Sequence, residues 1–485
     1  MALLITAARV KKMLAISLVV GVISGMGRVL SAPATSGGQT GAAATRSPAM
    51  LAFTHATIAD LKAGALQPNV TVLVRGDRIA LVAPDGRVEI PGGATTVDAR
   101  GHVLIPGLWD AHAHLSNAGV CSLKQSIAHG ITAVRDLGGP PAEGLAWRQD
   151  ITAGRMIGPR LFLAGLNIES GVWMERAKQF FAVSVPAGKN YPIWDWSPRF
   201  VMNGPQDAVA AVDSAAQFDV VKFRNLGAEA FRALATQTRR RGRRLVGHAP
   251  LGIGLADAAE AGLRSLEHGQ NLAIAMGSLS AAKREEQYGR IARSGMSITP
   301  TLVSDGMWAP TDLVRRVIAD SEGRIDPRRR HVSAQQLTIW EAMLIGREEP
   351  NRETYERAFG EEIAVVREAH RAGVVLLAGT DLGTVLTYPG SSLHEELELL
   401  VTRVGLSPLE ALRTATLNPA RFFGLEREMG EVKPGMVADL VLLRRDPLRD
   451  IRAARDIQSV IAAGRYFDSS ALASLRGCGD VRSPK

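Results

Sequence analysis

The sequence has few cysteines, few aromatic residues and little excess charge. Two cysteines among 485 residues exclude a disulfide framework and a cysteine-based zinc site, and they allow at most one bridge, between Cys121 and Cys478. We expect Cys121 to be a small core residue rather than a nucleophile. With 46% hydrophobic and 22% charged residues, the composition also excludes a disordered or collagen-like chain. Chains of this length form one large elaborated domain or two to three domains.

The chain also lacks a hydrophobic run that spans a bilayer comfortably, which takes about 20 residues. The nearest run, Met13–Gly27, follows Lys11 and Lys12 and precedes small residues at 31–34. This order predicts a secretory signal peptide over residues 1–34. We therefore expect an exported protein, periplasmic or secreted, without a stable membrane span once mature; the alternative is that the segment is retained as a membrane anchor. Residues 35–50 are rich in Gly, Ala, Ser and Thr and predict a flexible linker.

The excess of positive charge is small and partly local. The formal net charge is +9, and residues 1–34 hold four cations and no acid. Two basic runs, 238–244 and 328–330, are typical of solvated helix ends, where the helix dipole favours cations. Nothing resembles a nucleic-acid-binding module, so we expect a small-molecule substrate and no nucleic-acid partner. The sequence leaves a homo-oligomer open.

Hydrophobic patterning divides the chain into β-rich ends and an alternating centre. Short strands with turns occupy residues 51–104 and return at 424–468, before a tail over 469–485. Between them, residues 105–423 alternate short apolar strands with helical patterns, which is typical of βα units and a parallel sheet. We count eight candidate strands, which predict an α/β fold of the (β/α)₈ TIM-barrel type. Their expected ends are near His114, Asp136, Leu166, Lys222, His248, His268, Leu302 and Asp381.

Five of these strand ends carry a residue that can bind a metal. His112 and His114 are two apart on one strand, so both imidazoles face the same side. Lys222 interrupts a buried-strand pattern, where a bare ammonium needs a partner. It is either ion-paired with a carboxylate or a modified or metal-facing lysine, and the second interpretation is favoured. His248, His268 and Asp381 end three further strands, and each alone is also explained as a hydrogen-bonded structural residue. Together, nitrogen and oxygen donors without a thiolate suit zinc or another divalent first-row ion, and two ions need a bridging group.

Several motifs carry a family resemblance that runs from about residue 52 to 468. They are 105–114 (IPGLWDAHAH), 130–136 (GITAVRD), 267–269 (EHG), 379–381 (GTD), 415–420 (ATLNPA) and 435–440 (GMVADL). The chain resembles the amidohydrolase superfamily of metal-dependent hydrolases, in the branch of imidazolonepropionase-like proteins and prolidase-like dipeptidases. The resemblance implies that the β-rich ends form one small β-sandwich domain beside the barrel.

The resemblance also implies a binuclear metal site. His112 and His114 would bind the more buried ion, and His248 and His268 the more exposed one. Lys222, carbamylated by carbon dioxide, would bridge two divalent ions, expected to be Zn²⁺, and Asp381 would complete the first site. A hydroxide between the metals would attack the substrate, and Asp381 would take its proton and pass it to the leaving amine.

These expectations favour an exported hydrolase of carbon–nitrogen bonds in an amide, a dipeptide or a cyclic amide. The same site could hydrolyse an ester, lactone or phosphotriester, and a third alternative is a non-catalytic binding protein on this scaffold.

The connection 167–205 concentrates aromatic residues, which suggests either a lid that contacts an apolar or aromatic substrate or a loop with its own small core. They are Trp173, Phe180, Phe181, Tyr191, Trp194, Trp196 and Phe200. The remaining histidines are expected to be structural or on the surface: His55, His102, His129, His331, His370 and His394.

Overall fold

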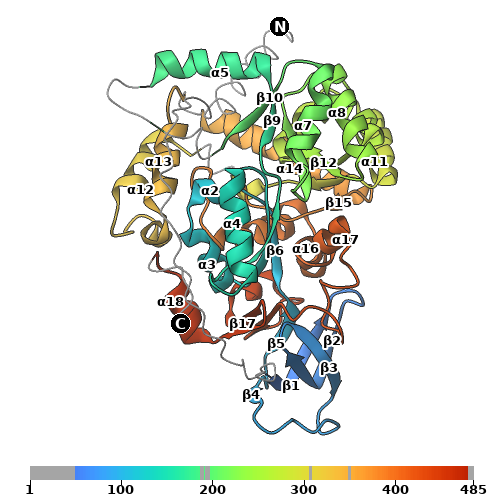
Figure 1. Cartoon of the computed structure of the whole chain (residues 1–485), viewed down its shortest axis with the longest axis vertical. Helices are drawn as coiled ribbons and strands as arrows, with labels where there is room; N and C mark the ends of the chain where they lie inside the picture. Colours follow the sequence, from blue (N-terminus) through green and yellow to red (C-terminus); the bar gives the residue numbers. More distant parts are fainter. Residues whose placement is uncertain (1–49, 186–190, 192–196, 305–308, 348–350, 479–485) are drawn as a thin grey trace, which may run out of the picture.

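A computed structural model describes residues 50–185, 191, 197–304, 309–347 and 351–478 (Figure 1). The expected signal peptide and almost all of the expected linker therefore lie outside the described residues, as do Trp194 and Trp196. Within the described ranges, no helix is both long enough and apolar enough to cross a membrane.

The two β-rich ends of the chain share one sheet. Strand order is β18-β17-β16-β5-β1-β2-β3, with β4 also paired to β1. The join is the antiparallel pairing of β5 with β16, in which Leu104 lies opposite Leu442. Alternate residues of these strands are buried in a shared core that includes Phe53, Val72 and Leu440. The strands are β1 (Met50–Asp60), β2 (Ala65–Arg75), β3 (Arg78–Pro84), β4 (Thr95–Asp98), β5 (Val103–Pro106), β16 (Leu440–Leu443), β17 (Ile457–Ala462) and β18 (Arg465–Phe467).

The centre of the chain is an α/β unit with two parallel sheets, β6-β7-β8 and β10-β9-β11-β12-β13-β14-β15. β6, β7 and β14 are buried along their whole length, as expected of strands covered on both faces. Backbone hydrogen bonds also link the sheets: Ala111 N donates to Ala378 O at 2.8 Å, and Asp219 N to Leu163 O at 2.8 Å. The strands are β6 (Leu108–Ala113), β7 (Ile131–Asp136), β8 (Arg160–Leu163), β9 (Asn167–Ser170), β10 (Arg199–Met202), β11 (Val220–Arg224), β12 (Arg244–Gly247), β13 (Leu263–Glu267), β14 (Ser297–Thr299) and β15 (Val375–Leu376).

Helices follow the parallel strands along the chain. Apolar side chains on these helices and strands make up the largest core of the molecule. The main helices are α3 (Cys121–Ala128), α4 (Pro141–Thr152), α7 (Ala208–Ser214), α8 (Ala228–Arg240), α9 (Leu255–Ala261), α10 (Gly269–Met276), α11 (Ala281–Ser294), α14 (Arg352–Arg371), α15 (Ser391–Leu399), α16 (Pro408–Thr414) and α17 (Leu417–Phe423).

Several predicted strand ends were wrong by a few residues. The third strand ends at Leu163, and the chain starts a new strand, β9, after a turn in which Gly165 has a φ of +68°. The seventh predicted strand is β14, which ends at Thr299 rather than near Leu302. The fourth is β11, which continues two residues beyond Lys222. The largest difference is β15, which ends at Leu376, so Asp381 lies in an irregular segment after it. Apolar runs show that a strand exists but not where its ladder of hydrogen bonds ends.

The two long connections contain helices that pack on one another. Segment 167–205 forms α5 (Gly171–Ser184), and segment 303–365 forms α12 (Thr311–Ala319), α13 (Ala334–Met343) and the start of α14. In Figure 1, α5 lies at the end of the molecule opposite β1–β3. Phe180 and Tyr191 pack against Ile339 and Ile345, in and just after α13. At least part of the aromatic connection therefore belongs to a small local core.

A disulfide joins Cys121 to Cys478, with the two Cα atoms 5.2 Å apart. Cys121 was expected to be a small core residue, but it is only half-buried and forms the one bridge that the sequence allowed. The tail begins with α18 (Ser469–Leu475), whose Leu472 and Leu475 are buried in the main core. The bridge ties the end of this helix to the start of α3.

His129, which is half-buried, and His394, which is buried, form a pair, in agreement with their predicted structural or surface role. His394 Nε2 lies 2.9 Å from His129 O, and His129 Nδ1 lies 2.9 Å from Gln125 O. Burial lowers the pKa of His129 to about 4 and that of His394 to about 3. Both rings are therefore neutral in the folded protein at pH 5, where an unfolded chain with histidine pKa values near 6.5 binds protons.

We expect this pair to make the protein less stable in acid. Below about pH 6.5 the unfolded state binds more protons than the folded state, so each ring lowers the free energy of unfolding by up to about 1.4 kcal/mol per pH unit. His394→Gln keeps an N–H donor for His129 O but cannot titrate. The free energy of unfolding should therefore fall less steeply between pH 6.5 and 4, by the slope that corresponds to the uptake of about one proton. Denaturant unfolding at several pH values measures this slope. His55→Gln, which removes a histidine whose side chain is 43% exposed, is the matched control; equal slopes in all three proteins would refute the assignment.

Candidate metal centre

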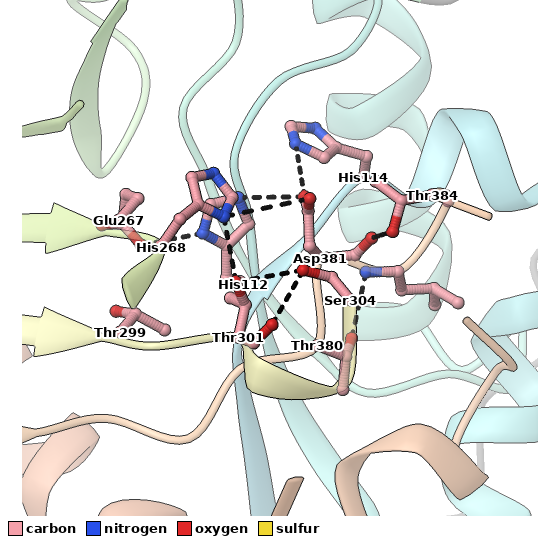
Figure 2. A network of polar contacts seen from close by, with 12 residues as sticks. His112, His114, Glu267, His268, Thr299, Thr301, Ser304, Thr380, Asp381 and Thr384 are labelled. Atoms are coloured by element: carbon pink, nitrogen blue, oxygen red, sulfur yellow. Dashed lines mark hydrogen bonds and ion pairs between the residues drawn. The ribbon is translucent and has the colours of Figure 1, made fainter. Parts of the chain in front are cut away.

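The predicted ligands converge at the carboxyl ends of the parallel strands. Figure 2 shows the rings of His112, His114 and His268 directed toward Asp381. Asp381 Oδ1 lies 3.3 Å from His112 Nε2 and 3.2 Å from His114 Nε2, and Oδ2 lies 3.9 Å from His268 Nδ1. Donor atoms of His112, His268 and Asp381 all lie within 4.8 Å of one another. This spacing allows the three side chains to bind a single ion.

His248 and Lys222 border this cluster. The His248 and His268 rings meet edge to face, with centroids 5.0 Å apart. Lys222 is 1% exposed, and its ammonium lies close enough to lower the pKa values of His114, His248 and His268. The structure therefore brings all six predicted residues to one region.

Local backbone geometry places Asp381 in the cluster despite the short β15. The amides of Thr380 and Asp381 both donate to His112 O, at 3.1 and 2.8 Å. A Cβ on Gly379 would lie 2.8 Å from the backbone nitrogen of His112, so only glycine allows this close approach. Asp381 itself has a φ of +54°, which is rare outside glycine and turns its side chain toward the histidines.

Buried polar atoms without partners indicate that the cluster is built for a cation. Among the described residues, His112 Nε2, Asp381 Oδ1 and Lys222 Nζ are buried and make no hydrogen bond. Native proteins rarely leave such atoms unsatisfied, because each costs about 1–3 kcal/mol. Imidazole nitrogens and a carboxylate oxygen suit a divalent first-row metal. A charged ammonium does not, so Lys222 fits only as a neutral amine or a modified anion.

Electrostatics favour the forms of these residues that bind metals. Burial is the main factor that lowers the pKa values of His114, His248 and His268, which keeps the rings neutral. Burial raises the pKa of Asp381, but His268, His112 and His114 outweigh it and hold that pKa well below its usual range. Burial also lowers the pKa of Lys222 to about 7. Metal ligands must be deprotonated, and this site provides that state at neutral pH.

Glu267 and Arg135 orient His112, and sequence reasoning gave neither a role. Glu267 Oε2 lies 2.8 Å from His112 Nδ1 and 2.9 Å from Arg135 Nη2. Arg135 also donates to Ala111 O at 2.5 Å and to Thr299 Oγ1 at 2.9 Å. When Nδ1 of His112 donates to the carboxylate, Nε2 is left free to face a metal. The available signal was a charged residue late in a buried strand: Arg135 is the penultimate residue of β7 and Glu267 the last residue of β13.

Asp110 and Thr301 support the site in the same way. Asp110 is buried and accepts hydrogen bonds from His112 N and Thr380 N, each at 3.1 Å, and from Thr380 Oγ1 at 2.6 Å. It thus connects β6 to the segment that carries Asp381. Thr301 Oγ1 lies 2.9 Å from His268 Nδ1, which directs the other ring nitrogen of His268 away from the threonine.

We expect Glu267→Gln to weaken metal binding and to destabilise the fold. The amide oxygen can still accept a hydrogen bond from His112 Nδ1. The amide is neutral, however, and leaves Arg135 buried without a counter-charge, which commonly lowers the free energy of unfolding by about 3–5 kcal/mol. Loss of such a supporting partner typically lowers metal affinity about 10–100-fold. Chelator competition and thermal unfolding measure the two effects. Glu260→Gln, which breaks an exposed pair with Arg290, is the control, and wild-type metal affinity in Glu267→Gln would contradict the role given to Glu267.

Comparisons with known proteins agree with this geometry. The model of the amidohydrolase family matches residues 103–466. Ochratoxinase from Aspergillus niger is 23% identical over 476 aligned positions, which cover 86% of this chain and 87% of that protein. Imidazolonepropionase from Rubrobacter xylanophilus is 26% identical over 403 positions, which cover 77% of this chain and 84% of that one.

Solved structures share the fold. A bottromycin amidohydrolase superposes with a TM-score of 0.64 at 25% identity, covering 88% of each chain. A Xaa-Pro dipeptidase superposes with a TM-score of 0.62 at 20% identity, covering 87% of this chain and all of that one. The family model spans both the strands that carry the predicted ligands and the strands that return to the small sheet. This chain therefore belongs to the amidohydrolase family of hydrolases.

Proposed function

We propose that this hydrolase cleaves a carbon–nitrogen bond in an amide, a dipeptide or a cyclic amide. The proposal rests on the position of the Asp381 carboxylate. It lies within 4 Å of three histidine rings, and one of its oxygens is buried without a hydrogen-bond partner. Relatives named as an ochratoxinase, an imidazolonepropionase and a bottromycin amidohydrolase support a hydrolytic use of this arrangement.

We also propose that the two parallel sheets close into one (β/α)₈ barrel, beside a small β-sandwich domain. The backbone hydrogen bonds from Ala111 to Ala378 and from Asp219 to Leu163 support closure at both junctions between the sheets. In that arrangement β8 and β9 are two halves of the third strand, and β10 lies outside the barrel beside β9. The site then lies at the carboxyl-terminal mouth, where barrels of this type place their active sites.

The proposed cofactors are two divalent cations, with Zn²⁺ favoured by the nitrogen-rich donors. His112, His114 and Asp381 would hold one ion, and His248 and His268 the other. Bound there, the cations would lower the pKa of water and polarise the substrate carbonyl. Lys222 would bridge them as a carbamate, formed when its neutral amine attacks carbon dioxide and releases a proton. The pKa of Lys222, lowered by burial to about 7, supports this because it provides neutral amine at physiological pH.

Asp381 would act as the proton shuttle. Its carboxylate is ionised at neutral pH, since the surrounding histidines hold its pKa low. It would accept the proton of the attacking water and deliver it to the departing nitrogen, which leaves as a neutral amine. Through their hydrogen bonds, Glu267 would hold the His112 ring in place during this transfer, and Asp110 would hold the segment that carries Asp381.

We further propose that the protein acts outside the cytoplasm. The order of residues 1–34 suggests export, and the Cys121–Cys478 disulfide supports it, because such bonds persist in oxidising compartments. N-terminal sequencing of the mature protein should find a start near residues 32–36. Recovery of intact Met1 in a soluble cytoplasmic pool, with both thiols free, would disprove export.

The test of the proposed function is turnover by purified full-length protein of known metal content. Dipeptides, N-acyl amino acids and cyclic amides are assayed with and without added Zn²⁺, beside matched esters and lactones. We expect amide cleavage that chelation abolishes and metal restores. Cleavage of the esters alone would assign the site to oxygen esters instead, and no turnover with two bound metals would indicate a binding protein.

A further inference from the structure

The first turn of α13 contacts the two segments that follow His114 and Asp381. α13 belongs to the long connection between β14 and β15, and it lies beside α2 (Leu115–Ala118) in Figure 1. Helix α2 begins directly after His114, and the Ala118 amide donates to His114 O at 3.2 Å. The second segment begins at Leu382, directly after Asp381, and His114 N donates to Leu382 O at 2.8 Å. The two segments therefore touch each other, and α13 is in contact with both.

Two side chains at the start of α13 hold α2. The Ser333 hydroxyl accepts a hydrogen bond from Gln336 N at 3.0 Å, which caps α13, and it donates to Ala118 O at 2.6 Å. The side-chain amide of Gln335 donates to Ser116 O. One hydroxyl therefore serves both as the cap of α13 and as its link to α2.

Gln336 holds the segment after Asp381. It is fully buried and donates from Nε2 to Thr387 O at 2.7 Å, whereas its Oε1 has no hydrogen-bond partner among the described residues. The Thr387 hydroxyl in turn accepts from Gly383 N at 3.1 Å and donates to Thr384 O at 2.7 Å. Thr384 N donates to Asp381 O at 3.1 Å. Because burying an amide with an unsatisfied oxygen costs stability, the bond to Thr387 is the gain that Gln336 provides.

The segment after Asp381 has an unfavourable backbone conformation. Asp381 has a φ of +54° and Leu386 a φ of +57°, and such values cost free energy in residues other than glycine. Residues remain in this conformation only where the surrounding contacts fix them. Thr387, which accepts the bond from α13, directly follows Leu386. The Tyr388 ring packs edge to face on Trp340 of α13, with centroids 5.5 Å apart, so α13 contacts this strained segment at two adjacent residues.

We propose that the first turn of α13 acts as a clamp that sets the distance between His114 and Asp381. Its positioning residues are Ser333, Gln335 and Gln336. Their hydrogen bonds end on backbone carbonyls, so they fix the backbone of each segment rather than a single side chain. His114 Nε2 and Asp381 Oδ1 lie 3.2 Å apart, a distance that a shift of either segment would change. This inference rests on the proposed hydrolase site and identifies what positions two of its metal ligands.

The first test separates the clamp from the helix cap at Ser333. Aspartate caps a helix as well as serine does, but an ionised carboxylate cannot donate to Ala118 O. Ser333→Asp should therefore raise amide hydrogen exchange in α2 and lower the affinity of the folded protein for Zn²⁺ about tenfold, measured by chelator competition. The added negative charge would by itself favour a cation, so a loss of affinity reports the lost hydrogen bond. Ser333→Thr, which can both cap and donate, should match the wild type.

The second test removes the bond to the segment after Asp381. Gln336→Met keeps the length of the side chain but has no donor for Thr387 O. Loss of a hydrogen bond that leaves a buried carbonyl unsatisfied commonly shifts a local equilibrium about 10–100-fold, so amide exchange over residues 382–388 should rise by that factor. Zn²⁺ affinity should fall at least about tenfold. The kcat of the Zn²⁺-loaded enzyme should fall while KM changes little, because Asp381 is the proposed proton shuttle.

Ile339→Val is the matched control, because Ile339 is buried in the same helix but packs with Phe180. It should lower thermal stability without a change in Zn²⁺ affinity or in exchange over residues 382–388. Unchanged exchange or unchanged Zn²⁺ affinity in Gln336→Met would overturn the inference, and wild-type behaviour of Ser333→Asp would overturn the link to α2. If the wild-type protein binds no Zn²⁺, the proposed metal centre fails instead, and the exchange rates alone then decide whether α13 clamps the two segments.

Discussion

Asp381→Asn is expected to abolish turnover more completely than it abolishes metal binding. Asparagine keeps the size of the side chain and one oxygen that can face a cation, but it is neutral and cannot accept a proton at neutral pH. The loss of a general base commonly costs about 10²–10⁴-fold, and the lost negative charge beside three histidines should add to this. The histidines and Lys222 remain to hold metal, so occupancy should fall less than kcat.

The decisive measurement for Asp381→Asn is metal stoichiometry and kcat on the same preparation. Asp439→Asn is the control, because Asp439 is also buried but pairs with Arg160 beside the small sheet at 2.6 Å. That control should lose stability and keep metal and turnover. Near-wild-type kcat in Asp381→Asn with full metal content would remove Asp381 from the chemistry.

Lys222→Met should lose metal and activity together. Methionine preserves an apolar stem at this buried position but supplies no anion, so Asp381 alone would remain to balance the two proposed cations. We expect most of the bound metal to be lost and activity to fall by at least about 100-fold. Removal of a group that only supports a metal ligand lowers metal affinity or activity by up to about 100-fold, and loss of a ligand should have at least that effect. Short carboxylic acids should restore part of the activity to Lys222→Ala by occupying the space that the side chain leaves.

Two further observations separate a bridging Lys222 from a structural one. Wild-type apoprotein reconstituted without carbon dioxide should take up less metal than the same protein with bicarbonate. Lys124→Met is the control for removal of a buried lysine, since Lys124 is 4% exposed and lies on α3. Full metal content and normal turnover in Lys222→Met would show that Lys222 only fills space.

Part of the site was predictable because its signal is local. An apolar run that ends in histidine or aspartate indicates both a buried strand and an unusual polar residue at its end. The i, i+2 spacing of His112 and His114 gives their common face, and the carboxyl ends of parallel strands meet at one edge. The same logic predicted that His248 and His268 lie at one edge, and their ring centroids are 5.0 Å apart.

Other parts were not predictable because their signal is not local. Arg135 and Glu267 are 132 residues apart in the sequence, and each alone resembles any charged residue in a strand. The pairing of Cys121 with Cys478 depends on how α18 returns to α3.

The sequence by itself determined the fold class, the division into β-rich ends and an α/β centre, and the six candidate ligands, because each rests on periodicity and residue chemistry along a few neighbouring positions. Only the tertiary structure decided how close those ligands lie, which protonation states burial favours, and which buried polar atoms have no hydrogen-bond partner. These properties depend on distances and solvent exclusion between segments far apart in the chain. Asp381 illustrates the difference: its residue type suggested a ligand, but only the fold around Gly379 brings its carboxylate within 3.3 Å of His112.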